Sequence, residues 1–435
     1  MHVRAVSSQT PNPTSPPGAG DVVAAVRERI RAFRALVDRP LTPYYLIVGI
    51  TTLLLALGLV MVLSTGSVID LTNGKSPYAD FEKQLLGVAI GLPLLWLAAR
   101  SSPRLFRAAA YPLVAVSILG LLLTLIHGVG QSQNGATRWI AFGPVQFQPS
   151  ELAKLALAVW GADLLARKEK LGLLTDWRHM LVPLLPGTAV LALLVMAGDD
   201  LGTTGVLLIV FLTLLWIAGT PGRVFAGMLV LMGIVLLLLI VTAPYRLERL
   251  LGYFNATNGT ASQQMLAQQW QGTQGRQALG SGGVFGVGIG ASRAQWGYVP
   301  EDTSDFIFAI LGEELGLVGT LCVTALYGGL AYAGLRVART SPDMFGRLVS
   351  AAITGWIVLQ AVINIGAVIG VLPITGVPLP LMSEGLSSLV VTMAALGMLL
   401  SFARRSPGAA EALAARGPGA MSRLLSWGGL GPRHL

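Results

Sequence analysis

Charged residues are scarce in this sequence. Only 12% of its 435 residues are Asp, Glu, Lys or Arg, about half of the share in an average soluble domain. The hydrophobic residues make up 53% of the chain and fall in long runs. This composition excludes an ordinary soluble protein and indicates a polytopic membrane protein.

Cysteine and histidine are scarce as well. The one cysteine, Cys322, lies inside an apolar run, so an intramolecular disulfide is excluded. The four histidines are scattered along the chain, and none stands at a spacing typical of metal ligands. The sequence therefore predicts neither a disulfide framework nor a resident metal site.

The hydrophobic runs predict an all-α polytopic fold. Ten of them are long enough to cross about 30 Å of hydrocarbon, at 44–65, 83–99, 105–126, 149–166, 179–197, 201–219, 223–243, 305–335, 347–371 and 386–403. We expect three regions: a disordered, partly basic tail (1–43), a ten-helix membrane domain (44–405) and a flexible tail (406–435). No short apolar core with a small-residue cleavage site precedes the first run, so no cleaved signal peptide is predicted.

Positive charge predicts the orientation of these spans. With ten spans both termini share a side, and the segments on that side hold most of the 30 Lys and Arg. The positive-inside rule places both termini in the cytoplasm. The net charge of +9 is explained by the anionic inner leaflet, so membrane lipids and no nucleic acid are the expected partners of these charges.

The longest connection, residues 244–304, is predicted to be extracytoplasmic, between the seventh and eighth spans. A loop of about 60 residues is unusual and tends to be functional. It is either disordered or packed on the membrane surface, and its aromatic residues favour the second alternative: Trp270, Phe285, Trp296 and Tyr298.

Ionisable residues inside a bilayer are costly and therefore informative. In "QPSELAK" Pro149 suits the start of a helix, and Glu151 and Lys154, three residues apart, share a helix face. A packing salt bridge is the first interpretation of this pair and direct chemistry is the second. In "GDDLGTT" Asp200 either caps the next helix or lines an active site.

Five carboxylates lie where the 244–304 loop enters a span: Glu301, Asp302, Asp305, Glu313 and Glu314. Asp305 either caps the span together with Ser304 or acts as a general base. The second role is favoured because neighbouring carboxylates at a low-dielectric boundary raise one another's pKa values. Glu313 and Glu314 point in different directions from a helix, which predicts separate roles. The preceding run "GSGGVFGVGIG" permits close backbone approach to a ligand, and arginines predicted to be external suit phosphate. Together they indicate an anionic, membrane-anchored substrate.

Several ordered blocks carry a family resemblance: "NGATRWIAFGPVQFQPSELAKLALAVW", "DLGT", "GSGGVFGVGIGAS", "VPEDTSDFIFAILGEELGLVG" and "INIGAVIGVLPITGVPLPLMSEG". Over residues 44–405 the chain resembles the SEDS family, the group of FtsW, RodA and SpoVE. The resemblance implies a ten-helix fold and a peptidoglycan glycosyltransferase. The implied substrate is lipid II, a disaccharide-pentapeptide on undecaprenyl pyrophosphate, which the family polymerises outside the cytoplasmic membrane.

The resemblance also implies site residues. The family's catalytic aspartate falls on Asp305, its "QPSE..K" pair on Glu151 and Lys154, and its aspartate before "LGT" on Asp200. With the glycines and arginines, the predicted substrate-binding residues are Arg138, Glu151, Lys154, Asp200, Arg246, Arg276, Ser281, Gly282, Gly283 and Glu301. The chain departs from the family pattern at three places: the histidine before Thr-Asp is missing, Asp199 replaces a proline, and "SEGLSS" has Glu384 and Leu386.

The length, the basic N-terminal tail and "GEELGLVG" favour the division (FtsW) type over the elongation (RodA) type. The resemblance then implies a class B penicillin-binding protein transpeptidase and other divisome proteins as partners, and a place in the bacterial cytoplasmic membrane at the division site. The one candidate cofactor is a divalent cation, Mg or Mn.

Two other functions remain open from the sequence. A flippase for lipid-linked precursors would place its site near the bilayer midplane and often shows internal repeats. No repeat is visible, and the unusual polar residues gather toward the external face, which disfavours this alternative. A non-catalytic scaffold that recruits a transpeptidase is the third possibility.

Overall fold

The computed structural model describes residues 27–28, 31, 39–72, 76–133, 136–143, 145–241, 263–294, 303–409 and 411–412. Each of the ten predicted spans is helical in it, the fifth as two consecutive helices. The helices are α2 (Thr42–Thr72), α3 (Ala79–Arg100), α4 (Pro103–Thr124), α5 (Pro149–Lys170), α6 (Trp177–Leu181), α7 (Leu184–Ala197), α8 (Leu201–Ile217), α9 (Gly222–Val241), α12 (Ile307–Thr340), α13 (Met344–Val368) and α14 (Leu386–Arg404).

Eight helical segments in the described part of the chain are long and apolar enough to cross a membrane. Two of the predicted spans fall outside this set, for visible reasons. Helix α5 carries three charged residues in its apolar part, Glu151, Lys154 and Asp163, and α8 has 17 residues. The chain is thus a multi-pass membrane protein, as its composition predicts.

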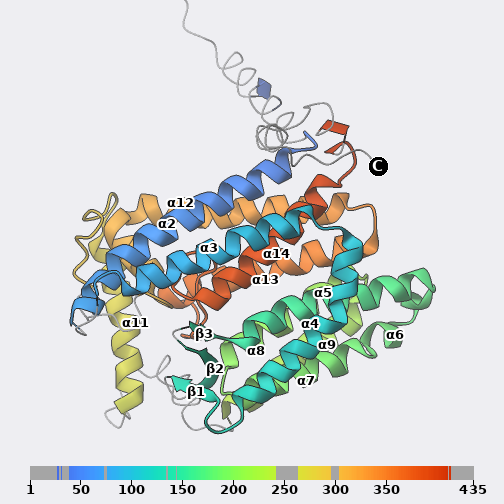
Figure 1. Cartoon of the computed structure of the whole chain (residues 1–435), viewed down its shortest axis with the longest axis horizontal. Helices are drawn as coiled ribbons and strands as arrows, with labels where there is room; N and C mark the ends of the chain where they lie inside the picture. The colour runs from blue at the N-terminus through green and yellow to red at the C-terminus, as the bar shows by residue number, and fades with distance from the viewer. Residues whose placement is uncertain are drawn as a thin grey trace, which may run out of the picture.

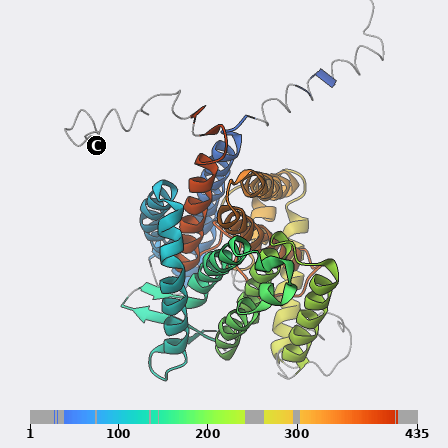
Figure 2. The same cartoon turned by 90° about the vertical axis from the view of Figure 1, so that its right-hand side faces the viewer.

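The helices form two groups that meet at α13 (Figures 1 and 2). Helices α2, α3, α12 and α14 pack on one another in the first group, and α4, α5, α7, α8 and α9 form the second. Helix α13 contacts α12 and α14 on one side and α5 and α8 on the other. Its buried residues include Trp356, Gln360 and Asn364, so polar side chains lie at the junction of the two groups.

A small antiparallel sheet lies between α4 and α5, where the sequence predicts only an external connection. Its strands are β1 (Gly130–Gln133), β2 (Ala136–Phe142) and β3 (Val145–Phe147), in the order β1-β2-β3. Gly130 pairs with Ile140, and Ile140 pairs with Phe147. The all-α description is therefore confirmed for the spans and incomplete for this connection, because strands of three to seven residues give a much weaker pattern than long apolar runs.

A further helix, α11 (Gln263–Ser281), lies within the long 244–304 connection. It contacts α12 and α13 and runs across their ends, as Figure 1 shows at the left. The sequence favours a packed segment over a disordered one for this loop, and α11 agrees with that preference. Trp296 and Tyr298 lie outside the described residues.

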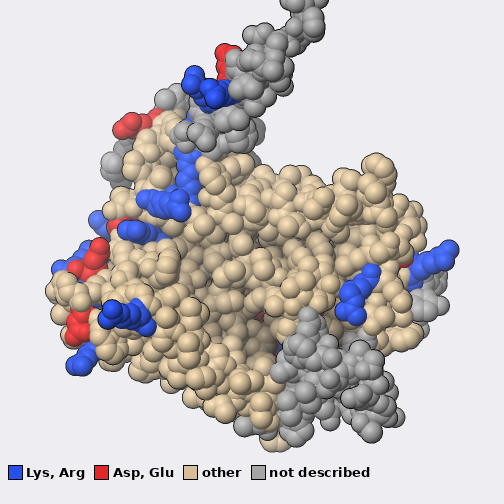
Figure 3. Space-filling model, turned by 180° about the vertical axis from the view of Figure 1, so that it is seen from behind, with Lys and Arg blue, Asp and Glu red and all other residues tan. Residues whose placement is uncertain are grey.

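The ends of the described chain lie together at the opposite end of the bundle. An Arg336 guanidinium nitrogen donates to the main-chain oxygen of Arg39 (3.3 Å), and Gly408 lies against Pro40. In Figure 3 most Lys and Arg on the visible face gather toward this end, beside a broad uncharged surface. This arrangement is the one expected if this end faces the cytoplasm.

Candidate active site

Asp305 lies in the turn that leads into α12. The N-cap residue of this helix is Phe306, so Asp305 lies one residue before the cap position, and its capping role stays a prediction. The main-chain oxygen of Asp305 accepts a hydrogen bond from Asn364 Nδ2 (2.8 Å), which also donates to the oxygen of Val377 (2.8 Å). The carboxylate faces Gly376, where an added Cβ would lie 3.5 Å from Oδ2. The Asn364 side chain thus links the turn that contains Asp305 to the segment that contains Gly376 and Val377.

Asn364 belongs to a row of polar side chains on α13. Trp356, Gln360 and Asn364 follow one another at intervals of four, hence on one helix face. Gln360 Oε1 accepts from Trp356 Nε1 (2.8 Å) and from Lys154 Nζ (3.0 Å), and its Nε2 donates to the oxygen of Pro378 (2.9 Å). The row therefore links α5 to the segment that faces Asp305.

Glu151 and Lys154 form the predicted salt bridge. Their charged atoms are 2.8 Å apart, and both side chains are at most 2% exposed. The ammonium also lies 5.0 Å from the centre of the Trp356 ring. Such burial favours the packing interpretation, because neither charge is open to a substrate from solvent. A direct role in substrate binding stays a prediction for this pair.

Asp200 is both a helix cap and part of a polar cluster. Its carboxylate accepts from Thr203 N (3.0 Å) at the start of α8, from Thr203 Oγ1 (2.7 Å) and from Gln148 Nε2 (3.1 Å). Arg138 NH1 lies 3.7 Å from Asp200 Oδ1. Both residues line a small open hollow, together with Thr124, Thr137, Ser150 and Gly198. The two interpretations of Asp200, cap and wall of a site, are thus compatible.

The Asp200 cluster and Asp305 are joined through one segment. A Cβ added at Gly202, two residues after Asp200, would lie 2.6 Å from the main-chain oxygen of Thr375. The next residue is Gly376, which faces Asp305. Segment 375–378 therefore contacts the start of α8, the α13 row and the Asp305 turn at once.

Glu384, one of the departures from the family pattern, lies beside the same turn. Its main-chain nitrogen donates to the oxygen of Thr303 (2.9 Å), and Ser383 Oγ donates to the oxygen of Ser304 (2.5 Å). Lys83 Nζ bonds Asp80 at 2.7 Å and lies 3.9 Å from Glu384. Burial, followed by the charge of Asp80, raises the pKa of Glu384 from 4.5 to about 7.

This raised pKa predicts a stability that falls as the pH rises. A buried carboxyl whose folded pKa exceeds its unfolded value stabilises the fold fully below pH 4.5 and loses that contribution through pH 7. Glu384→Gln should therefore raise the thermal unfolding midpoint at pH 8 and leave it unchanged at pH 4. The gain is at most about 3 kcal/mol. The matched control is Glu82→Gln, at an exposed position of α3, the helix that carries Asp80 and Lys83. Equal midpoints of wild type and Glu384→Gln at pH 8 would contradict the prediction.

The two glutamates deeper in α12 hold the glycine-rich segment. The Glu313 carboxylate accepts from Ser292 Oγ (2.5 Å) and from the main-chain nitrogens of Arg293 and Ala294 (both 3.2 Å). Glu314 Oε1 accepts from Ser64 Oγ of α2 (2.5 Å) and from Gly290 N (3.0 Å). The two carboxylates thus have different partners, although both bind residues of the stretch 290–294.

The glycines of this segment approach a helix closely. A Cβ on Gly282 would lie 2.0 Å from the oxygen of Gly312, and one on Gly286 would lie 2.0 Å from that of Glu314. Close packing on α12 is thus a sufficient reason for glycine at both positions. Gly283 is exposed with a φ of 56°, and Ser281 Oγ donates to the oxygen of Ala278 (2.8 Å). Their role in substrate binding stays a prediction.

The remaining predicted site residues are dispersed. Arg276 lies on α11 against Gly370, where an added Cβ would be 2.8 Å from its NH1. Arg246 and Glu301 lie outside the described residues. In the described part of the chain no three His, Cys, Asp or Glu side chains are grouped so that they could hold a metal ion. The structure thus brings together Asp305, Lys154 and Glu151 through α13, with Asp200 and Arg138 alongside.

Sequence reasoning did not find Gln360, Asn364 and Ser383. A signal for the first two exists, because Trp, Gln and Asn at intervals of four on an otherwise apolar span place polar groups on one face. Ser383 contacts the Asp305 turn by donating to the oxygen of Ser304. The two residues are far apart in the sequence, so no local pattern predicts this contact.

Comparison with known proteins gives a consistent result. Residues 44–407 match the family model described as cell cycle protein, FtsW/RodA/SpoVE. A probable peptidoglycan glycosyltransferase FtsW of Mycobacterium tuberculosis is 41% identical over 95% of this chain and 76% of its own length. Stage V sporulation protein E of Bacillus subtilis is 37% identical over 84% of this chain and 98% of its own length.

A solved chain from a peptidoglycan synthase complex that coordinates polymerization and crosslinking has the same fold. It superposes with a TM-score of 0.66 at 29% identity, covering 82% of this chain and 97% of that one. The family match covers nearly all of the helical region, and its limits agree with the 44–405 expected from the sequence blocks. The chain therefore belongs to the FtsW/RodA/SpoVE family.

Proposed function

We propose that the chain is a peptidoglycan glycosyltransferase that polymerises lipid II into glycan strands at the outer face of the cytoplasmic membrane. Relatives named for this activity match most of its length. The observation that carries the proposal is Asp305. It lies at the start of a membrane-spanning helix, at the end of the bundle opposite the chain ends, in a turn held by Asn364 and Ser383.

The reaction needs a base and a clamp for the leaving group. The acceptor sugar hydroxyl attacks the anomeric carbon of the donor, its proton passes to the Asp305 carboxylate, and the pyrophosphate leaves with the electron pair of the broken bond. Because the leaving group is already stable, no carboxylate nucleophile is required, unlike the pair in retaining glycoside hydrolysis. Asp305 thus acts as the general base.

Arginines on the same side would stabilise the departing pyrophosphate. Arg138 beside Asp200 and Arg276 on α11 are the described candidates. If a divalent cation takes part, the Asp305 carboxylate would hold it, and the ion would stabilise negative charge on the leaving group.

We base the proposed partner and cellular role on the similarity to these relatives. A complex that couples polymerization to crosslinking has the same fold, which supports a class B penicillin-binding protein transpeptidase as partner. Identity of 41% to an FtsW over 95% of the chain supports the division type, and with it a place at the division site.

The direct test is to supply lipid II to the purified protein, with and without the transpeptidase, and to measure glycan polymer. Polymer formation that depends on this chain supports the proposal. Transport of labelled lipid II across vesicles without polymer would favour the flippase, and neither activity in an intact complex would favour the scaffold.

Asn364 provides a second prediction, as a positioning residue. Asn364→Leu keeps the size of the side chain and removes both hydrogen bonds, to Asp305 and to Val377. A small displacement of a catalytic group lowers the rate by up to ~100-fold. We expect kcat to fall between ~10-fold and ~100-fold with KM for lipid II nearly unchanged. Leu359→Ala, an exposed change on the same helix, should leave kcat unaltered, and a rise in KM alone would point to a substrate contact instead.

A further inference from the structure

The glycine-rich segment after α11 is joined to α12 by its main chain. Val287 N and Gly288 N donate to the oxygens of Glu313 and Glu314 (2.9 and 3.0 Å), and the nitrogens of Leu317 and Val318 donate to the oxygens of Gly283 and Val284 (2.9 and 3.2 Å). The exchange is possible because α12 is broken at Gly316, whose φ is 67°. Paired peptide groups are what a segment needs where water is scarce.

The side chains of the same segment are apolar and uncovered. No charged residue occurs between Arg276 and Arg293. Phe285 is 83% exposed, and three aliphatic neighbours are exposed to between 47 and 61%: Val284, Val287 and Ile289. This apolar patch continues onto α12, where Leu317, Val318 and Leu321 are exposed on a span that faces lipid. Contiguous apolar surface of this kind marks a binding surface.

Two helices place the patch relative to the membrane. The contact of Arg336 with Arg39 marks the charged end of α12, next to the start of α2. Along α12 from Arg336 to Leu317, next to the break at Gly316, the distance is about 29 Å, and along α2 from Thr42 to Ser64 it is about 33 Å, at a rise of 1.5 Å per residue. Ser64 and Glu314 are in contact, so both helices give the same level. With ordinary helix tilt, the level of this Ser64–Glu314 contact lies about 30 Å from the charged end, and this distance equals the thickness of the hydrocarbon.

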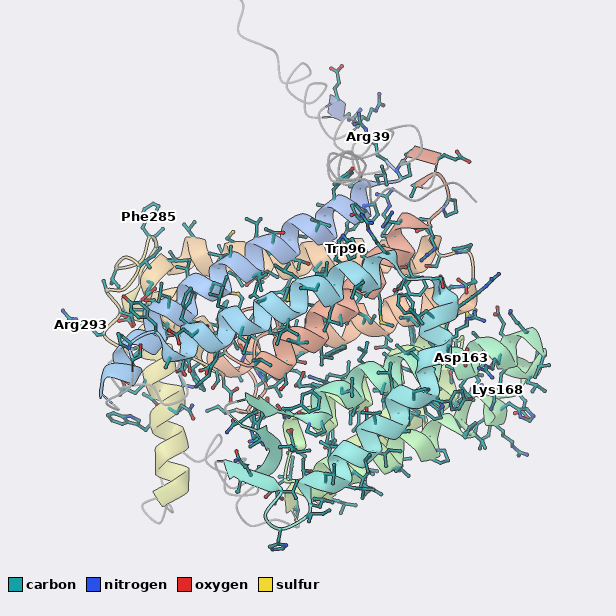
Figure 4. The ribbon with its side chains drawn as sticks, viewed as in Figure 1. Arg39, Trp96, Asp163, Lys168, Phe285 and Arg293 are labelled. Carbon is teal, nitrogen blue, oxygen red and sulfur yellow. The ribbon has the colours of Figure 1, made fainter. Side chains whose placement is uncertain are left out.

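We propose that residues 283–289 insert into the outer leaflet, with Val284, Phe285, Val287 and Ile289 among the acyl chains next to the lipid headgroups. Figure 4 agrees with this placement. Phe285 projects sideways from the bundle, across the direction of α2 and α12, whereas Arg293 projects beyond the helix ends. The occupant of the patch is thus the lipid surface. The inference does not depend on the proposed enzymatic activity.

The test measures the depth of single nitroxide labels. Phe285→Cys, Val287→Cys and Ile289→Cys are made in a Cys322→Ser background, since Cys322 is an exposed thiol, and each labelled protein is reconstituted in phosphatidylcholine vesicles. Collision with oxygen, which partitions into lipid, is compared with collision with a water-soluble nickel chelate. Gln277→Cys and Arg293→Cys, at exposed polar positions of the same region, are the matched controls.

We expect a ratio of oxygen to nickel collisions that is severalfold higher at 285, 287 and 289 than at 277 and 293. Nickel collisions as frequent as at the controls would overturn the proposal, because the patch would then face water. Protection from both reagents would also overturn it, because a protein surface, of a second copy or of a partner, would cover the patch. Three label positions keep the result independent of any single variant that fails to fold.

Discussion

Asp305→Asn should lower the rate of glycan polymerisation by at least ~100-fold, the lower value usual for general-base catalysis. The amide has nearly the shape of the carboxylate and cannot accept the proton of the attacking hydroxyl. Folding should be retained, because the contacts of the turn with Asn364 and Ser383 use main-chain oxygens of Asp305 and Ser304. The measurement is polymer formation from lipid II by the purified variant.

Two controls separate chemistry from structure in this experiment. Yield and complex formation with the transpeptidase should equal those of the wild type, as expected if only the base is lost. Asp302→Asn removes a neighbouring carboxylate of the same sequence block and should cost much less activity. A well-folded Asp305→Asn protein with near-normal rate would show that Asp305 is not the base.

Lys154→Met should destabilise the protein by about 3–5 kcal/mol, because the Glu151 carboxylate remains buried without its partner. The expected result is a lower folded yield and a lower thermal midpoint in detergent. Loss of the Lys154 bond also releases Gln360 Oε1, so the remaining protein should polymerise lipid II more slowly.

The double variant distinguishes a packing pair from two substrate contacts. Glu151→Gln with Lys154→Met removes both charges, and much of the lost folding free energy should return, since no lone buried charge remains. Independent losses of activity that multiply in the double variant at normal yield would identify separate substrate contacts instead. Lys170→Met, at the exposed last residue of α5, serves as the control for loss of a lysine.

The spans were predictable because lipid imposes a simple requirement. Apolar runs of near-spanning length predict helices, and within the described residues all ten runs are helical, the fifth as two helices. The departures come from contacts that a local pattern does not contain. The strands of the 130–147 sheet are only three to seven residues long, and α11 is much less hydrophobic than a membrane span.

The site was predictable only where a side chain is unusual for its surroundings. Glu151, Lys154 and Asp200 stand out as charges beside apolar runs, and the structure gives each of them a defined partner. Asn364 and Gln360 are uncharged, and their effect depends on the carbonyl groups of residues 305, 377 and 378, which only the folded chain brings near. Likewise, the glycine run indicates close approach, and only the structure shows that α12 is what it approaches.

The pairing of α3 with α14 has a consequence for synthesis. Gln84 on α3 is buried, donates to the oxygen of Ser383 (3.1 Å) and accepts from Gly385 N (3.3 Å). These partners are encoded about 300 residues later, so at ordinary elongation rates they emerge from the ribosome roughly 15–60 s after α3. During that interval a polar side chain waits in the bilayer without its final partners. A chain that stops before Ser383 would therefore be left with an exposed amide in the membrane, a feature by which quality-control proteases could distinguish unfinished copies from complete ones.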